Sequence, residues 1–159
     1  MKSAISLLAV MAAGVGCISS DSTRESNRVT VVRARSLTPL ETDVAFAKLA
    51  QEVPIADAFH RYTDARSVEF PANGAPKFGR LAIRASLEGL KPGAIQWIPQ
   101  GGETAQGGDM AWTWGTFTLH GPRGDEHGKY VSVWHTGPDG SWYLSADIGN
   151  TEPEVQQAK

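Results

Sequence analysis

The sequence predicts an α+β domain whose N-terminal helices pack on a strongly curved antiparallel sheet. Apolar residues recur every three to four positions between residues 38 and 90, which is the period of an amphipathic helix. From residue 95 to residue 150 the chain consists of short runs rich in β-branched and aromatic residues, with turn residues between them. Helices followed by a long antiparallel sheet are typical of the α+β class. A sheet curved over helices leaves a cavity at its mouth, and we expect a ligand there.

Capping residues predict where the first helix begins. Thr38 can act as the N-cap, Pro39 suits the first helical position, and Glu41 completes a capping box. We expect this helix to run to about Gln51. Its apolar stripe is expected to comprise Leu40, Val44, Phe46, Ala47 and Leu49.

Two further helices and five strands are predicted along the rest of the chain. Pro54 opens a helix that reaches about Tyr62, and the apolar spacing of Gly79–Leu90 predicts the third helix. The segment Gly137–Ser141 is a turn signal between the last two strands, because proline presets φ and glycine accepts positive φ. The strands are expected at Ser67–Phe70, Ile95–Thr104, Met110–Leu119, Lys129–Thr136 and Trp142–Ile148.

Composition and charge exclude several classes of protein. The chain has 159 residues, which favours a single domain, and its net charge of −2 with no basic stripe argues against nucleic-acid binding. No apolar run reaches the roughly 18 residues that a membrane-spanning helix needs. The four histidines, His60, His120, His127 and His135, lack the close spacing of metal ligands, so we expect neither a metal site nor a cofactor.

The first residues have the features of an export signal. Lys2 precedes an apolar segment, and small residues lead to Cys17, the single cysteine of the chain. We therefore expect residues 1–16 to be a signal peptide, 17–37 a flexible tether, 38–150 the domain and 151–159 a disordered tail. The pattern resembles a lipoprotein signal, in which Cys17 is lipidated and anchors a periplasmic or outer-membrane protein. Plain cleavage after Gly16, which gives a secreted protein, is the alternative.

Several short motifs in the domain carry a resemblance to a known family. From about Glu41 to Asn150, the chain resembles the nuclear transport factor 2-like superfamily, also called the cone fold or cystatin-like roll, which includes ketosteroid isomerase and the SnoaL-like cyclases. Within it, the chain is most similar to a branch of bacterial domains of unknown function. The motifs are Asp43-x-x-Phe46-Ala47, Ala58-Phe59, Gly79-x-x-Ala82-Ile83-Arg84, Gly108-Asp109-x-Ala111-x-Thr113-x-Gly115, Gly128–Trp134, Asp139–Trp142 and Asp147–Asn150.

The resemblance implies a fold with a pocket rather than one activity. The superfamily contains isomerases, cyclases, dehydratases and non-enzymatic binding proteins, and its curved sheets often dimerise through the outer face. Neither Tyr62 nor Asp64 lies in a motif that matches the catalytic residues of ketosteroid isomerase. We expect a small-molecule-binding domain. The alternatives are an isomerase, cyclase or hydrolase of a small apolar substrate, and a homodimeric protein-interaction module.

The candidate site residues come from the helices and from the tryptophan-rich strands. Asp147 and His60 are the candidate acids or bases, with a solvated or capping Asp147 and a surface or core-edge His60 as the alternatives. The expected ligand is a small apolar molecule, because aromatic side chains suit an apolar binding wall, although the same residues can fill the core instead. The expected ligand-binding residues are Tyr62, Trp97, Trp112, Trp114, Tyr130, Ser132 and Trp134.

Overall fold

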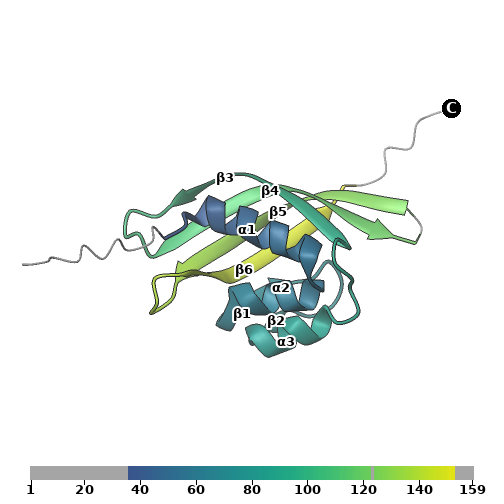
Figure 1. The fold of residues 1–159 in the computed structure, drawn as a ribbon, viewed down its shortest axis with the longest axis horizontal. Coiled ribbons are helices and arrows are strands. Elements are labelled where there is room, and N and C mark those ends of the chain that lie inside the picture. Colours follow the sequence, from purple (N-terminus) through teal and green to yellow (C-terminus); the bar gives the residue numbers. More distant parts are fainter. Residues whose placement is uncertain (1–35, 123, 153–159) are drawn as a thin grey trace, which may run out of the picture. The chain divides into compact units, whose positions relative to one another are not determined.

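The computed structural model describes residues 36–122 and 124–152. The predicted signal peptide and Cys17 lie outside these residues, as do most of the predicted tether and tail. Three helices and six strands make up the described domain, and the helices lie over one face of the sheet (Figure 1). The elements are α1 (Pro39–Glu52), α2 (Ile55–Tyr62), β1 (Thr63–Phe70), β2 (Lys77–Phe78), α3 (Gly79–Ser86), β3 (Ile95–Thr104), β4 (Met110–Gly121), β5 (Gly124–Thr136) and β6 (Trp142–Thr151).

Helix α1 begins as the capping residues predict, but it buries a different face. The Glu41 amide donates to Thr38 Oγ1 at 3.2 Å and the Thr38 amide donates to the Glu41 carboxylate at 2.8 Å, so the capping box is formed. Two residues of the expected apolar stripe are exposed, Leu40 at 37% and Val44 at 51%. Asp43 is fully buried in their place, because the sheet supplies hydrogen bonds for its carboxylate.

The second and third helices match the prediction in position, but the third is shorter than expected. Helix α3 ends at Ser86 rather than Leu90, and a turn containing Gly89 at a φ of 88° follows it. Ile83 is the buried residue of this helix, whereas Leu81 is 77% exposed. The apolar spacing therefore overestimated both the length of this helix and its buried face.

The sheet is mixed rather than purely antiparallel. Its strand order is β2-β1-β6-β5-β4-β3, and β3 to β6 form the antiparallel meander that the sequence predicts. Strand β1 starts at Thr63, earlier than expected, and pairs in parallel with β6. The side-chain pattern of a strand does not specify its partner, so this pairing of distant segments could not be derived from the sequence.

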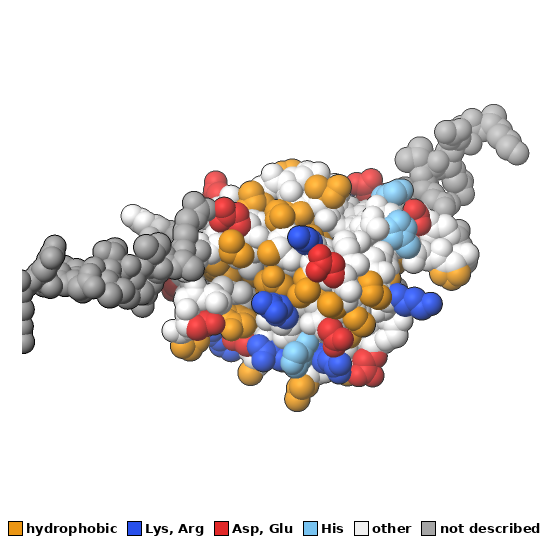
Figure 2. Space-filling view, in the orientation of Figure 1, with side chains coloured by type: hydrophobic (Ala, Val, Ile, Leu, Met, Phe, Trp, Pro, Cys, Tyr) orange, Lys and Arg blue, Asp and Glu red, His pale blue; other side chains and the backbone are white. Residues whose placement is uncertain are grey.

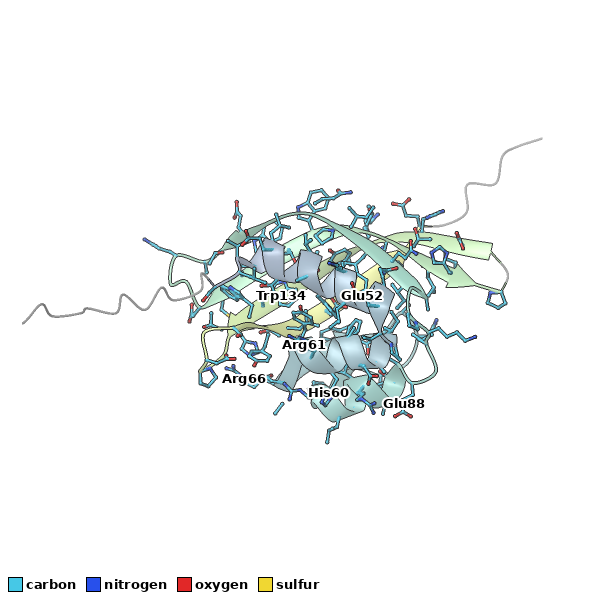
Figure 3. All side chains as sticks on the ribbon, in the orientation of Figure 1. Glu52, His60, Arg61, Arg66, Glu88 and Trp134 are labelled. Atoms are coloured by element: carbon cyan, nitrogen blue, oxygen red, sulfur yellow. The ribbon has the colours of Figure 1, made fainter. Side chains whose placement is uncertain are left out.

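The core lies between the helices and the inner face of the sheet. Trp134 is fully buried there, and its Nε1 donates to Thr113 Oγ1 at 2.8 Å (Figure 3). Phe46 of α1 makes edge contacts with Phe59 and Trp97, with ring centroids 4.9 and 4.7 Å apart. On the surface that carries the helices, charged side chains of both signs lie among hydrophobic ones (Figure 2). Within the described residues, no helix has the length and apolar character needed to cross a membrane.

Candidate functional site: an aromatic cavity with carboxyl groups on its wall

A cavity of about 400 Å³ lies between the inner face of the sheet and the helices. Known small-molecule sites have volumes of about 300–1,000 Å³, so this cavity can hold a small organic molecule. Most of its wall is aromatic or aliphatic. The apolar side chains that line it include Phe46, Phe59, Phe70, Leu87, Ile95, Trp97, Phe117 and Leu119.

Glycines on the inner face of the sheet make room for the aromatic wall. A side chain at Gly128 would lie 2.4 Å from the ring of Phe117, and a side chain at Gly115 would lie 2.8 Å from the ring of Tyr130. Both distances are shorter than any normal contact between carbon atoms. These two rings can therefore lie close against the sheet only because the residues beneath them are glycines.

Asp147 lies on the wall of the cavity and is only partly exposed. Ser132 Oγ, on the neighbouring strand β5, donates to Asp147 Oδ1 at 2.6 Å. Burial raises the pKa of Asp147 to about 7, and the nearby charges of Asp43 and Glu69 act in the same direction, against the opposing effect of the Ser132 hydrogen bond. The carboxyl group is thus close to half protonated at neutral pH, which is the condition for a general acid or base.

A bulge in β6 brings Asp147 to the inner face. Strict alternation along β6 would put Asp147 and Leu144 on different faces of the sheet. In the structure both side chains lie on the inner face. Between the pairs Val133↔Ala146 and Trp134↔Leu144 the register shifts, which leaves Ser145 as the extra residue. Strict alternation from Tyr143 would give Asp147 a common face with Ser145 and Tyr143, and the bulge removes this arrangement.

The buried imidazole of His135 holds this bulge. His135 Nδ1 lies 2.6 Å from Ser145 Oγ, and His135 Nε2 lies 3.0 Å from Asp64 Oδ2 on β1. His135 is 5% exposed, and its contacts join β5 to the extra residue of β6 and to the start of β1. The contacts of His135 with Ser145 and Asp64 therefore contribute to the site indirectly, because they fix the register of β6 that orients Asp147.

A second carboxyl group, that of Asp43, lies behind the wall. Tyr130 OH donates to Asp43 Oδ2 at 2.8 Å, and Trp97 Nε1 donates to Asp43 Oδ1 at 3.0 Å. Burial raises the pKa of Asp43, although hydrogen bonds from Thr113, Tyr130 and Trp97 oppose this effect. Burial, together with the Asp43 charge, also holds the pKa of Tyr130 far above its usual value, so its phenol stays protonated. The network fixes the Tyr130 and Trp97 rings on the cavity wall.

A third carboxyl group, that of Glu69, lies beside Asp147. The parallel ladder pairs Glu69 of β1 with Asp147 of β6, and both residues line the cavity. Ser86 Oγ donates to Glu69 Oε2 at 3.2 Å. Burial raises the pKa of Glu69, while the Ser86 hydrogen bond and the charge of Lys77 oppose that rise. Two adjacent carboxyl groups therefore lie in a wall that is otherwise mainly apolar.

The structure brings together four of the predicted site residues and separates the other five. The four that line the cavity are Trp97, Tyr130, Ser132 and Asp147.

The other five predicted residues lie elsewhere. Trp134 lies in the core, and Tyr62 lines a different cavity near the turn that connects β5 to β6. His60 lies on α2, and its Nδ1 atom is buried without a hydrogen-bond partner among the described residues (Figure 3). Trp112 and Trp114 are each 41% exposed on the outer face of the sheet, so the aromatic wall that the sequence predicted on the cavity side does not contain them.

Sequence reasoning missed Asp43 and Glu69 as site residues. Asp43 belongs to one of the motifs that carried the family resemblance, which was the available signal for its role. Glu69 gave no local signal, because its place beside Asp147 depends on the parallel pairing of β1 with β6. In the described part of the chain, no group of three or more histidine, cysteine or acidic side chains is arranged to hold a metal ion.

Comparison with solved structures identifies the fold. No protein-family model and no curated protein matches the chain. A proposed ketosteroid isomerase from Parabacteroides distasonis is 18% identical with a TM-score of 0.60, over 75% of this chain and 92% of that one. An NTF-2 like protein of unknown function from Shewanella oneidensis is 14% identical with a TM-score of 0.56, over 70% of this chain and 98% of that one.

A third neighbour comes from a different functional class. A proposed calcium/calmodulin-dependent protein kinase II association domain from Xanthomonas campestris is 17% identical with a TM-score of 0.57, over 72% of this chain and 85% of that one. At such low identities the similarity establishes the architecture and not the activity. The chain has the nuclear transport factor 2-like α+β fold, with three helices on an open, curled, mixed sheet.

Proposed function

We propose that the domain binds a small, largely apolar molecule in the aromatic cavity. The observation that carries this proposal is the cavity itself, whose volume of about 400 Å³ is lined mainly by aromatic and aliphatic side chains. Ser132, Tyr130 and Asp147 supply hydrogen-bonding groups at one part of the wall. An apolar body with one polar group therefore matches the distribution of side chains.

Comparing the binding of a neutral probe to an open and to a blocked cavity tests this proposal. The probe is 2-phenylethanol, and its binding is followed by the changes in protein chemical shifts in NMR spectra. Leu119→Trp places a bulky indole ring in the cavity wall, whereas Ile98→Trp places the same ring on the outer face, where residue 98 is 67% exposed. We expect wild type and Ile98→Trp to bind the probe and Leu119→Trp to lose binding. Equal binding by all three proteins would place the ligand elsewhere.

The second candidate function is proton transfer on the bound molecule. The observation that favours it is the position of Asp147 on the cavity wall, where burial raises the pKa of its carboxyl group to about 7, a value suited to a general base at neutral pH. Tyr130 and Ser132 line the same wall and can orient a substrate oxygen. Hydrogen–deuterium exchange at the α-carbon of small cyclic ketones, measured by NMR for wild type and Asp147→Asn, tests this function. Exchange at the buffer rate in wild type would argue against it for these substrates.

We also propose that the domain forms a homodimer through the outer face of its sheet. Several large apolar side chains are exposed on this face, and exposed apolar patches are typical of protein–protein contact sites. The neighbour from Xanthomonas campestris is described as an association domain, which agrees with assembly on this fold. The exposed residues are Ile98, Met110, Trp112, Trp114, Val131 and Ile148.

Sedimentation of charge variants tests the dimer. Trp114→Glu puts a charge on the outer face, and Leu81→Glu puts the same charge on α3, where residue 81 is 77% exposed. We expect a dimer for wild type and Leu81→Glu, and a monomer for Trp114→Glu. A monomeric wild type at high micromolar concentration would overturn the proposal.

Finally, we propose that the protein is exported and anchored through a lipid on Cys17. The proposal rests on Lys2, the apolar segment that follows and the single cysteine at its end. Mass spectrometry of the membrane fraction should find an acylated Cys17 at the mature N-terminus. A protein that keeps Met1 would contradict export, and an unmodified mature chain in the periplasm would contradict the anchor.

A further inference from the structure

The ionisable residues of the cavity wall share one sign of charge. Glu69, Glu126 and Asp147 line the cavity, and no lysine, arginine or histidine is present among its described lining residues. Asp147 and Glu69 lie side by side in the parallel ladder, while Glu126 is exposed on β5. A carboxylate-bearing ligand would meet like charges here and no basic residue in the described wall.

Other groups near the carboxyl pair do not provide the missing positive charge at the wall. Asp43 adds a negative charge from α1, and Tyr130 on β5 keeps its proton. Lys77 of β2 interacts with Glu69, but it does not line the cavity. The two carboxyl groups therefore lie at one part of an apolar cavity without a basic partner in the wall.

We infer that the cavity selects an organic cation, with an ammonium group between Asp147 and Glu69 and an apolar body against the aromatic rings. This inference rests on the proposed small-molecule-binding function and specifies the ligand class. An ammonium group would replace the proton that keeps one of the two adjacent carboxyl groups neutral. The rings of Phe46, Phe59 and Phe117 offer an apolar surface, and aromatic faces attract cations as well.

Three matched probes test the charge preference. These are 2-phenylethylamine, 2-phenylethanol and phenylacetate, which share a phenyl ring and differ in the charge of the terminal group. Binding is measured by calorimetry at pH 6 and pH 8, where the amine stays protonated. We expect the amine to bind at least about tenfold more tightly than the alcohol at pH 8, and the anion to bind most weakly.

The pH dependence of amine binding distinguishes contact of the ammonium group with the Asp147 carboxylate from burial of the phenyl ring alone. An amine that needs ionised Asp147, with a pKa of about 7, should bind about tenfold more tightly at pH 8 than at pH 6. Asp147→Asn should remove both this pH dependence and the preference for the amine, while the binding of the alcohol is retained. Glu69→Gln should weaken the preference, and Glu103→Gln, at an exposed position of β3 outside the cavity wall, should leave it unchanged.

The outcomes separate this inference from the function on which it rests. If the alcohol binds as tightly as the amine at both pH values, the cation inference is overturned and the apolar binding site remains. If all three probes fail to bind, or bind equally to Leu119→Trp, the proposed cavity function is overturned as well. The comparison of pH 6 with pH 8 uses wild type alone, so it holds even where a variant does not fold.

Discussion

Replacing Asp147 with asparagine should stabilise the protein at alkaline pH, although the residue lies in the proposed binding site. The pKa of its carboxyl group is about 7 in the folded protein, compared with the ordinary value of 3.8 that applies to the unfolded chain. A raised carboxyl pKa means that its full contribution to stability is present below pH 3.8 and is lost as the pH rises through about 7. Asparagine has the shape of aspartate and does not ionise, so it avoids that loss.

The size of the effect follows from the difference between the two pKa values. One pKa unit corresponds to about 1.4 kcal/mol, so a rise from 3.8 to about 7 gives about 4 kcal/mol in total. About 1.5 kcal/mol of this is already lost at pH 5, which leaves roughly 2–3 kcal/mol between pH 5 and pH 8. The loss of charge should therefore raise the relative stability of Asp147→Asn by this amount over that interval.

Urea denaturation at pH 5, 6, 7 and 8 measures the effect. The readout is the change with pH in the difference between variant and wild type, because any pH-independent loss of the Ser132 hydrogen bond cancels in this comparison. Glu103→Gln is the matched control for removing an acidic charge at an exposed position. Stability curves of Asp147→Asn and wild type that run parallel from pH 5 to pH 8 would refute the argument that Asp147 is held partly protonated by burial.

Three further substitutions test the core, the Asp43 network and the start of α1 by chemical denaturation. Trp134→Ala should cost about 3–5 kcal/mol because the indole is fully buried, and a cost below about 1 kcal/mol would contradict its place in the core. Tyr130→Phe should cost about 1–3 kcal/mol because it removes a hydrogen bond to buried Asp43, and an unchanged stability would argue against that bond. Thr38→Ala should cost about 1 kcal/mol through loss of the helix cap, and no loss would show that the capping box contributes little.

The sequence predicted the elements that depend on local patterns. The capping box of α1, the three helices and the β3–β6 meander follow from spacing, caps and turn residues, and the structure has all of them. It did not predict the parallel β1–β6 pair, because pairing between distant segments depends on the whole fold. That pair places Glu69 beside Asp147, so half of the carboxyl pair could not be found from the sequence.

Buried polar groups limited the prediction of the site. The stripe on α1 was placed by hydrophobicity, but Thr42 and Asp43 are buried there through hydrogen bonds that a hydrophobicity pattern does not contain. Asp147 lines the cavity, but strict alternation along β6 would place it on the other face of the sheet from Leu144, and the bulge at Ser145 breaks that alternation. A single extra residue reverses the face of everything beyond it, and no residue in β6 signals this bulge clearly.

The pKa of Asp147, measured with and without a cationic probe, tests the central claim most directly. The claim is that this carboxyl group lies in an apolar cavity and contacts the ligand there. The resonance of its carboxyl carbon can be followed by NMR from pH 3 to pH 9 in protein that carries carbon-13 aspartate. Comparison with Asp147→Asn identifies which resonance belongs to Asp147. We predict a midpoint of about 7 in the free protein and a clear fall when 2-phenylethylamine is added. A midpoint near 4 that the amine does not change would contradict the account.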